Sequence, residues 1–191
     1  ESTDGLTRVK DIVENLKNFS LKNTEGVQTV DVCTICNQLI TLISAQYSAP
    51  HYKFECEHEK VEVMGNPGPL KQALMNVMIN AAQAIETKGF VKLSVIEKGD
   101  SVVIKILDSG CGIPVKHRKR LFEPFFTTKP EGQGQGLGLS VAYTAIEQHQ
   151  GKISISSKEN KGTVVEITIP KQLSCLENES IDSELDSPLT P

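Results

Sequence analysis

The chain has 191 residues, of which 38% are hydrophobic, and it carries 20 Lys and Arg against 24 Asp and Glu. This apolar content is typical of a globular domain, and no run approaches the roughly 18 apolar residues that a membrane-spanning helix needs. The net charge of −4 lies within residues 171–191, so residues 1–170 are neutral overall and show no general preference for nucleic acid or anionic lipid. Because the chain starts without Met or a signal peptide, we expect a soluble piece of a longer protein, whose other parts could be membrane-anchored.

The cysteine pattern argues against a disulfide-stabilised fold. Five cysteines, an odd number, are scattered over positions 33, 36, 56, 111 and 175. Such a set in a domain of this size does not form a disulfide framework, and a reducing cytoplasm suits it best. Cys33 and Cys36 have the CxxC spacing of zinc and redox sites, but without a second pair this spacing is a weak signal.

The first predicted element is a helix over residues 5–20. Its apolar residues Leu6, Val9, Val13 and Leu16 alternate at spacings of three and four, which suits a helix bundle or coiled coil. An ordinary helix packed on a core has the same periodicity, so both interpretations stay open.

The rest of the chain mixes strands and helices. Strands are expected near residues 27–31, 52–57, 61–65, 90–97, 101–107, 152–157 and 163–169. Helices are expected near residues 31–48, 69–87 and 137–149, the first of them capped by Asp31. This order predicts an α/β sandwich with helices on one face of a mixed sheet, followed by an acidic flexible tail over residues 171–191.

The expected helix over residues 69–87 has two contrasting faces. Its apolar face contains Leu70, Leu74, Val77, Ala81 and Ile85, and its opposite face contains Gln72, Asn76, Asn80 and Gln83. A polar face is commonly just solvated, but Asn is a poor helix former, so two Asn one turn apart suggest work for their carboxamides. An amide oxygen is a hard, neutral ligand that suits Mg²⁺ held mainly by phosphates and water.

A carboxylate is expected on the apolar side of a strand. Ile104, Ile106 and Asp108 point the same way, and a buried carboxylate is costly unless it meets donors. The exocyclic amine of adenine would be such a donor, and Gly110 and Gly112 would let the backbone pass close to a flat base. A plain Asp-Ser-Gly turn that ends a hairpin is the alternative.

Residues 109–135 form a long segment rich in Gly, Pro and Lys, with little room for regular structure. A segment of this length in a compact domain is usually functional, and we expect a nucleotide lid over about residues 113–136. It ends in glycines at 132, 134, 136 and 138 that lead straight into a helix, whose free N–H groups suit phosphate. The flanks are basic, with Lys116, Arg118, Lys119, Arg120 and Lys129, and this cluster would suit a triphosphate. The three Phe residues at 122, 125 and 126 are expected to give the lid one apolar anchor on the core. The glycines match neither the P-loop nor the GxGxxG pattern.

Five segments in order resemble the motifs of the GHKL superfamily, and within it those of sensor histidine kinases. The segments are NVMINAAQAI at 76–85, DSGCGIP at 108–114, LFEPFFTTK at 121–129, GQGQGLGLS at 132–140 and Gly162-Thr163. The resemblance covers about residues 30–170 and implies the two-layer Bergerat α/β sandwich, ATP and Mg²⁺ as cofactors, and histidine kinase activity.

The resemblance also implies a role for single residues. Asp108 would accept the adenine amine, with Thr163 beside it, and Asn80 would be the Mg²⁺ ligand. Asn76 and Lys129 would join Asn80 in catalysis, with Lys129 at the terminal phosphate. The remaining pocket residues would be Gly110, Gly112, Phe122, Gly134, Gly136, Leu137 and Gly138. Two departures, Gln135 in place of the usual Thr or Ser and Gln83 in place of a Lys, put local phosphate contacts in doubt.

The same resemblance divides the chain and implies partners. Residues 1–22 are similar to the end of a dimerisation and phosphotransfer helix, 23–30 are a linker and first strand, 31–170 are the catalytic domain, and 171–191 are the tail. None of His51, His58, His117 and His149 has the acceptor pattern, and the last two are expected at the surface. The implied partners are the dimerisation domain of a homodimer and a response-regulator receiver domain, with no nucleic acid and no direct membrane contact.

Other activities share this fold and stay open as alternatives. ATP-hydrolysing clamps place a Glu four residues before the metal Asn, where it can activate water. Asn76 occupies that position here, and a carboxamide cannot take a proton. This difference favours a kinase. A serine kinase of the anti-sigma type, or a nucleotide-binding module without catalysis, would be separated only by its partner chemistry.

Overall fold

The computed structural model describes residues 26–48, 50–130 and 134–173. The helix expected over residues 5–20, Gly132 of the glycine-rich loop and most of the acidic tail lie outside these residues. Within them the order of elements is that expected from the sequence, with one addition, a short 3-10 helix in the lid segment.

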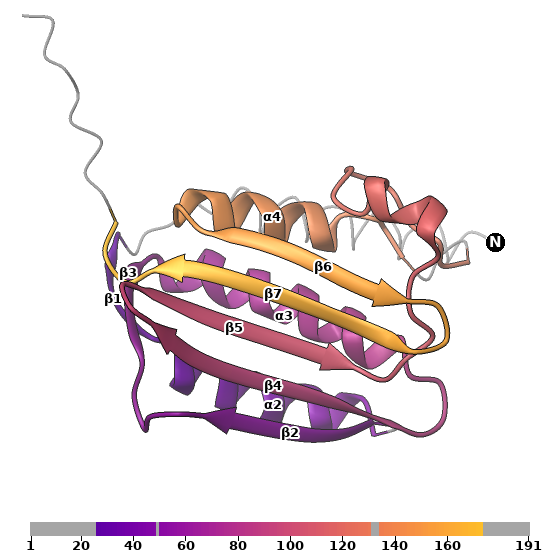
Figure 1. The fold of residues 1–191 in the computed structure, drawn as a ribbon, viewed down its shortest axis with the longest axis horizontal. Coiled ribbons are helices and arrows are strands. Elements are labelled where there is room, and N and C mark those ends of the chain that lie inside the picture. Colours follow the sequence, from indigo (N-terminus) through magenta and orange to yellow (C-terminus); the bar gives the residue numbers. More distant parts are fainter. Residues whose placement is uncertain (1–25, 49, 131–133, 174–191) are drawn as a thin grey trace, which may run out of the picture.

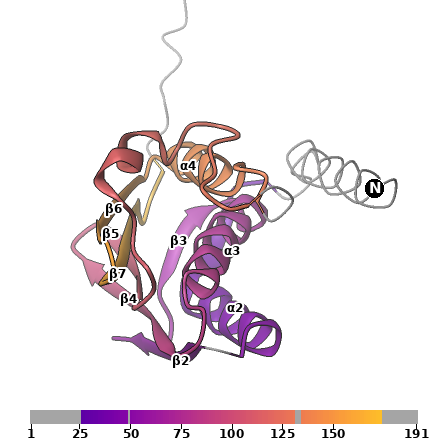
Figure 2. The same ribbon diagram turned by 90° about the vertical axis from the view of Figure 1, so that its right-hand side faces the viewer.

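One face of a five-stranded sheet is covered by helices (Figures 1 and 2). The strands are β2 (Pro50–Cys56), β4 (Gly89–Lys98), β5 (Ser101–Asp108), β6 (Lys152–Lys158) and β7 (Gly162–Pro170), and the helices are α2 (Val32–Gln46), α3 (Pro67–Gln83) and α4 (Gly138–Gln148). The sheet order is β2-β4-β5-β7-β6, with β2 parallel to β4 and the other pairs antiparallel. A separate pair joins β1 (Gln28–Asp31) to β3 (Glu62–Gly65). The expected two-layer α/β sandwich is therefore confirmed.

The core lies between the sheet and the helices. It is formed by alternate residues of the strands and by the apolar faces of the helices. Alternate residues of β5, Val102, Ile104 and Ile106, are buried against the helices. The apolar face predicted for α3 is buried throughout, from Leu70 to Ile85. Since Asp108 continues the inward-facing row of β5, its carboxylate is also buried, at 4% exposure.

Side chains that accept backbone N–H bonds set the starts of two helices. Asp31 caps α2 as expected and accepts from Cys33 N at 3.0 Å, with further bonds from Thr34 Oγ1 at 2.5 Å and Val61 N at 3.4 Å. Although its burial raises the pKa of this carboxyl, the hydrogen bonds outweigh burial and lower the pKa overall. Asn66 caps α3 in the same way by accepting from Gly68 N at 3.2 Å.

The lid segment has more regular structure than expected. Residues Val115–Arg120 form the 3-10 helix η1, which starts where His117 N donates to Pro114 O at 3.0 Å. A 3-10 turn needs only i to i+3 bonds, so a short run between prolines can form it even though an α-helix would be interrupted.

The expectation that His149 lies at the surface is wrong. Its side chain is 2% exposed at the end of α4. Asn66 N donates to Nε2 at 2.9 Å, so the remaining ring nitrogen, Nδ1, is the donor to Ala145 O at 2.7 Å. The ring fills the space beside Gly65, where even a Cβ would come within 2.5 Å of it. His117, in contrast, is half-exposed in η1.

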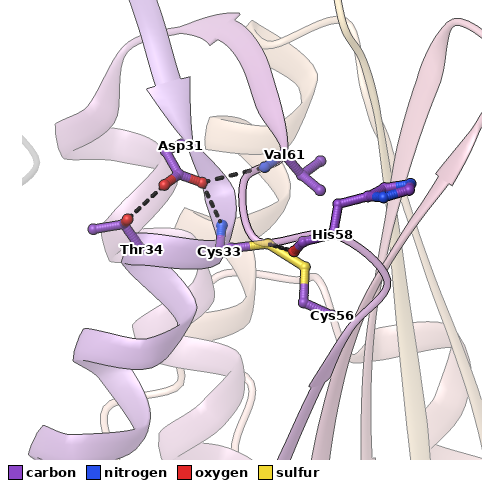
Figure 3. The surroundings of a disulfide bond; sticks show 6 residues. All are labelled: Asp31, Cys33, Thr34, Cys56, His58 and Val61. Carbon is purple, nitrogen blue, oxygen red and sulfur yellow. Dashed lines mark hydrogen bonds between the residues drawn. A yellow bond between two sulfur atoms is a disulfide. The ribbon is translucent and has the colours of Figure 1, made fainter.

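The expectation of unpaired cysteines is also wrong at one pair. Cys33 in the first turn of α2 forms a disulfide with Cys56 at the end of β2 (Figure 3). The two residues are 23 positions apart, and only the packing of α2 beside β2 brings them together. Cys36 is buried one turn further along α2, and burial raises the pKa of its thiol to about 12. The CxxC spacing therefore provides no reactive thiol pair, and Figure 3 shows the His58 ring pointing away from the sulfurs.

Candidate functional site

Asp108 is the last residue of β5 and lies at the same end of the sheet as the start of β7 (Figure 1). Burial raises the pKa of its carboxyl, while hydrogen bonds from the backbone N–H groups of Gly110 and Thr163 act against that rise. The Gly110 N–H lies 2.9 Å from Oδ1. Two N–H donors satisfy only part of the four acceptor positions of a carboxylate, so the group can still accept a bond from a ligand amine.

Ser157 connects the parts of the site and was not singled out from the sequence. Its hydroxyl accepts from Ile113 N at 2.8 Å, lies 3.0 Å from Gly162 O and lies 2.9 Å from Thr163 Oγ1. It therefore fastens the start of the lid segment to β6 and to the buried Thr163 of β7. Ser157 lies opposite Thr163 because of the register of the hairpin between β6 and β7. Ser157 belongs to none of the sequence motifs, so its position in the site could not be predicted from them.

Gly110 and Gly112 are required by contacts within the chain. A Cβ at Gly110 would lie 2.5 Å from the carbonyl oxygen of Ala84 at the end of α3. A Cβ at Gly112, whose φ is +68°, would overlap the carbonyl of Lys158. These contacts are with the protein backbone, so they explain both glycines without the close approach of adenine that we expected from the sequence.

The polar face of α3 meets α4 through Asn76. Its Nδ2 donates to Gly138 O at 3.0 Å, and its Oδ1 accepts from Gln72 Nε2 at 3.2 Å. Asn76 thus holds the first turn of α4, directly after the glycine-rich loop. The carboxamide expected to act in catalysis also has this structural duty.

Changing Asn76 to Asp should destabilise the domain, because the carboxylate loses the Nδ2 donor and sets a negative charge against the Gly138 carbonyl. A fall of about 1–3 kcal/mol in the free energy of unfolding is expected. Urea unfolding would measure it. Asn37→Asp on the exposed face of α2 is the matched control, expected within about 0.5 kcal/mol of the parent. Equal stability of the two variants would contradict this role.

Lys129 of the lid segment reaches the other two amides on this face of α3. Its Nζ donates to Asn80 Oδ1 at 3.4 Å and to Gln83 Oε1. Burial lowers the pKa of this ammonium, and none of the ion pairs between described residues involves it. The structure therefore brings together Asn80 and Lys129, which the sequence places 49 positions apart.

The expectation that the three Phe residues of the lid segment form one apolar anchor is wrong. Phe122 packs on Tyr143 of α4, with ring centroids 5.1 Å apart. Phe126 packs on His117, and Arg120 lies over its ring at 4.3 Å. Phe125 is 73% exposed, so the expectation is wrong for this residue.

Two of the basic residues expected near a triphosphate are used inside the lid segment itself. Arg120 pairs with Glu123 at 2.8 Å, and Arg118 Nε donates to Ile113 O at 3.4 Å. Lys116 and Lys119 are exposed on η1. Among the five basic residues, Lys129 is the one held against α3.

Gly134 and Gly136, which precede α4, pack closely against residues 125–129. A Cβ at Gly134 would lie 3.1 Å from Cδ of Lys129, so the absence of a side chain leaves room for the lysine stem. Gly136 has φ of +67° and no space for a Cβ beside the backbone of Phe125. Leu137 precedes the helix and has no side-chain cap, so the first N–H groups of α4 are not capped by that residue.

These groups fit ATP with Mg²⁺. Asp108 offers a buried acceptor for an amine, Asn80 offers an amide oxygen that already faces a cation, and the start of α4 offers N–H groups. No group of three or more His, Cys, Asp or Glu gathers as a metal site among the described residues, so the Mg²⁺ would depend on Asn80, phosphate and water.

Comparison with known proteins identifies the family. The family model described as histidine kinase-, DNA gyrase B-, and HSP90-like ATPase matches residues 65–173. Sensor histidine kinase ZraS of Escherichia coli strain K12 is 34% identical over 173 residues, which cover 89% of this chain and 36% of ZraS. The chain thus spans about a third of the length of that relative.

Solved structures agree on the fold. The catalytic domain of histidine kinase ThkA, free of nucleotide, is 30% identical with a TM-score of 0.70, covering 77% of this chain and 97% of that domain. ThkA in complex with the response regulator protein TrrA is 27% identical with a TM-score of 0.72, covering 88% of this chain and 49% of ThkA. The chain belongs to the histidine kinase-, DNA gyrase B- and HSP90-like ATPase family, and within that family it has the catalytic, ATP-binding domain of a histidine kinase.

Proposed function

We propose that the domain binds ATP with Mg²⁺ and transfers the γ-phosphoryl group to a histidine on a dimerisation domain of the same protein. The observation that carries this proposal is the pairing of a buried acceptor, Asp108, with the contact between Lys129 and Asn80. One can recognise the base, and the other can hold the metal and the terminal phosphate. Positioning and charge stabilisation supply most of the catalysis in phosphoryl transfer, so no further chemical group is needed here.

Each residue of the site has a stated role in this proposal. Asp108 accepts the adenine amine, supported by Thr163, and Asn80 is the Mg²⁺ ligand. Lys129 neutralises charge at the terminal phosphate, and Asn76 keeps α4 in place beside it. The pocket and the lid are completed by Phe122, Leu137 and the glycines at 110, 112, 134, 136 and 138.

The nature of residue 76 supports transfer over hydrolysis. A clamp-type ATPase needs a general base that takes a proton from water. The Asn76 amide cannot do this, and its Nδ2 already donates to Gly138 O. Water is thus poorly activated at this position, and the phosphoryl group is kept for a protein acceptor.

Labelling with γ-labelled ATP tests the activity. The 191-residue chain alone should incorporate no label on histidine, and an added phosphotransfer domain should acquire acid-labile label on its histidine. Asp108→Asn should strongly reduce this transfer. Acid-stable label on Ser or Thr would contradict the proposal and indicate a serine kinase instead.

The partners follow from the same activity. We infer a homodimer through the dimerisation domain and a response-regulator receiver domain as the next acceptor. The second of these inferences is supported by the complex of ThkA with the response regulator protein TrrA. Contact with nucleic acid or with a membrane surface has no support in the near-neutral charge of residues 1–170. Within the described residues, no helix is both long and apolar enough to cross a bilayer.

The proposed location is the cytoplasm, where ATP is available. The bond between Cys33 and Cys56 stands against a reducing compartment, since disulfides are rare there. Alkylation of cells before lysis, followed by mass spectrometry, shows whether Cys33 and Cys56 are reduced or disulfide-bonded in cells. Alkylated thiols at Cys33 and Cys56 would show that the bond is reduced in cells and would support the cytoplasm, and a disulfide in cells would contradict the proposed location.

A further inference from the structure

We propose that Gln83 is a positioning residue for Lys129, holding its ammonium beside Asn80 so that the positive charge is in place before nucleotide arrives. The inference deepens the proposed function and rests on it, because Lys129 is assigned there to the terminal phosphate. Asn80 and Gln83 lie three residues apart on α3 and so face the same side of the helix. Lys129 Nζ donates to the side-chain oxygens of both.

The orientation of the Gln83 amide is fixed from behind. Its Nε2 donates to the Tyr47 hydroxyl at 3.1 Å, which turns Oε1 toward Lys129. Tyr47 ends α2, and its own carbonyl accepts from Tyr52 OH of β2 at 3.0 Å. The amide is thereby braced from two neighbouring elements and presents an acceptor to the ammonium.

Neutral partners suit an ammonium that must later bind phosphate. A carboxylate at these positions would cancel the charge, and a lysine at position 83 would repel Lys129. Two amide oxygens hold the ammonium and leave its charge uncompensated. If Asn80 holds Mg²⁺ as proposed, Gln83 would remain as the acceptor for the Lys129 ammonium.

The stem of Lys129 is also guided into this position. It passes beneath Gly134, where a Cβ would press on Cδ and Cβ of the lysine at 3.1 and 3.2 Å. The ammonium is therefore located by contacts at both ends of the side chain. Loss of the Gln83 acceptor should free the Lys129 ammonium while leaving the contact of the lysine stem with Gly134 in place.

The first test measures how strongly Gln83 restrains the Lys129 ammonium in the nucleotide-free chain. Gln83→Met keeps the shape of the side chain and removes the amide. The rate of amine acetylation at Lys129, relative to exposed Lys119, should rise roughly 5- to 10-fold, less than for a buried hydrogen bond to a charged group because Gln83 is exposed. Gln38→Met on the exposed face of α2 is the matched control and should leave the ratio unchanged. An unchanged ratio in Gln83→Met would overturn the inference.

The second test measures the consequence for phosphate binding. Calorimetry with Mg²⁺ should show that Gln83→Met lowers the preference for a non-hydrolysable ATP analogue over ADP by roughly 5- to 10-fold. Lys129→Met should lower it at least as much, and the double variant should lose no more than Lys129→Met alone. A purely structural Gln83 would instead weaken both nucleotides equally and would add to the effect of Lys129→Met.

The outcomes distinguish the two levels of the proposal. If Lys129→Met lowers the preference and Gln83→Met does not, the positioning role is overturned and the phosphate role stands. If Lys129→Met leaves the preference unchanged, the assignment of Lys129 to the terminal phosphate fails, and the positioning role fails with it.

Discussion

Asp108→Asn should weaken ATP binding by about 10- to 150-fold, because an interaction with an ionised acceptor contributes roughly 1.5–3 kcal/mol. The Asn amide can also turn its NH₂ group toward the base, where the exocyclic amine of adenine offers no acceptor. GTP, which carries a carbonyl where ATP carries this amine, should lose no affinity. Calorimetry with both nucleotides measures the difference, and Asp100→Asn in the exposed turn after β4 is the matched control.

The same variant should not be less stable without nucleotide. Burial raises the pKa of Asp108, so ionising this group costs more in the folded than in the unfolded chain. At neutral pH that cost is present, and Asn removes it. As pH falls through the raised pKa toward the ordinary value of 3.8, the parent protein becomes protonated and the advantage of the variant disappears. Urea unfolding from pH 7 to pH 4 follows this trend, and a large loss of stability at pH 7 would show that weaker ATP binding reflects unfolding.

Gly162→Ala should be the most damaging single change near the adenine site. Gly162 has φ of +93°, and an added Cβ would overlap the carbonyl oxygen of Asp108. Together, the positive φ at about 1–2 kcal/mol and overpacking against the backbone at about 1–3 kcal/mol predict a loss of about 2–5 kcal/mol in stability. Because the clash acts on the residue that recognises the base, ATP binding should be lost in any fraction that still folds.

Gly99→Ala separates the cost of a positive φ from the cost of a steric clash. This glycine also has positive φ, at +57°, in the turn between β4 and β5, but a Cβ would meet nothing within 4 Å. It should cost only about 1–2 kcal/mol and leave ATP affinity unchanged. Thermal unfolding and calorimetry of both variants make the comparison, and similar losses in both would show that only the backbone conformation matters.

The fold could be predicted largely because local patterns and tertiary packing agree. The apolar face of α3 and the alternation along β5 each identify a buried side, and both are buried as expected. The boundaries shifted where capping decided them. The helix expected to begin near residue 69 starts at Pro67, because Asn66 supplies the cap and Pro is tolerated in the first turn.

What could not be predicted depends on pairs that are distant in sequence. The contact of Lys129 with Gln83 and the bond of Ser157 to Ile113 each need the final arrangement of lid and sheet. The disulfide needs α2 packed beside β2. His149 did carry a signal, since it follows Ala142, Ala145 and Ile146 at helical spacing and so shares their buried side. A polar residue in that row needs partners, which are the Asn66 N–H and the Ala145 carbonyl.

The helix after the glycine-rich loop is fastened to α3 at both of its ends. At its start, Asn76 binds the Gly138 carbonyl, and at its finish, the His149 ring accepts the N–H of Asn66, which caps α3. These two hydrogen bonds restrict both sliding of α4 along α3 and rotation of α4 away from it. If residues 113–130 act as the proposed lid, we therefore expect nucleotide to enter and leave by movement of these residues while α4 stays in place. In that case the packing of α3 against α4 would remain intact while nucleotide is exchanged.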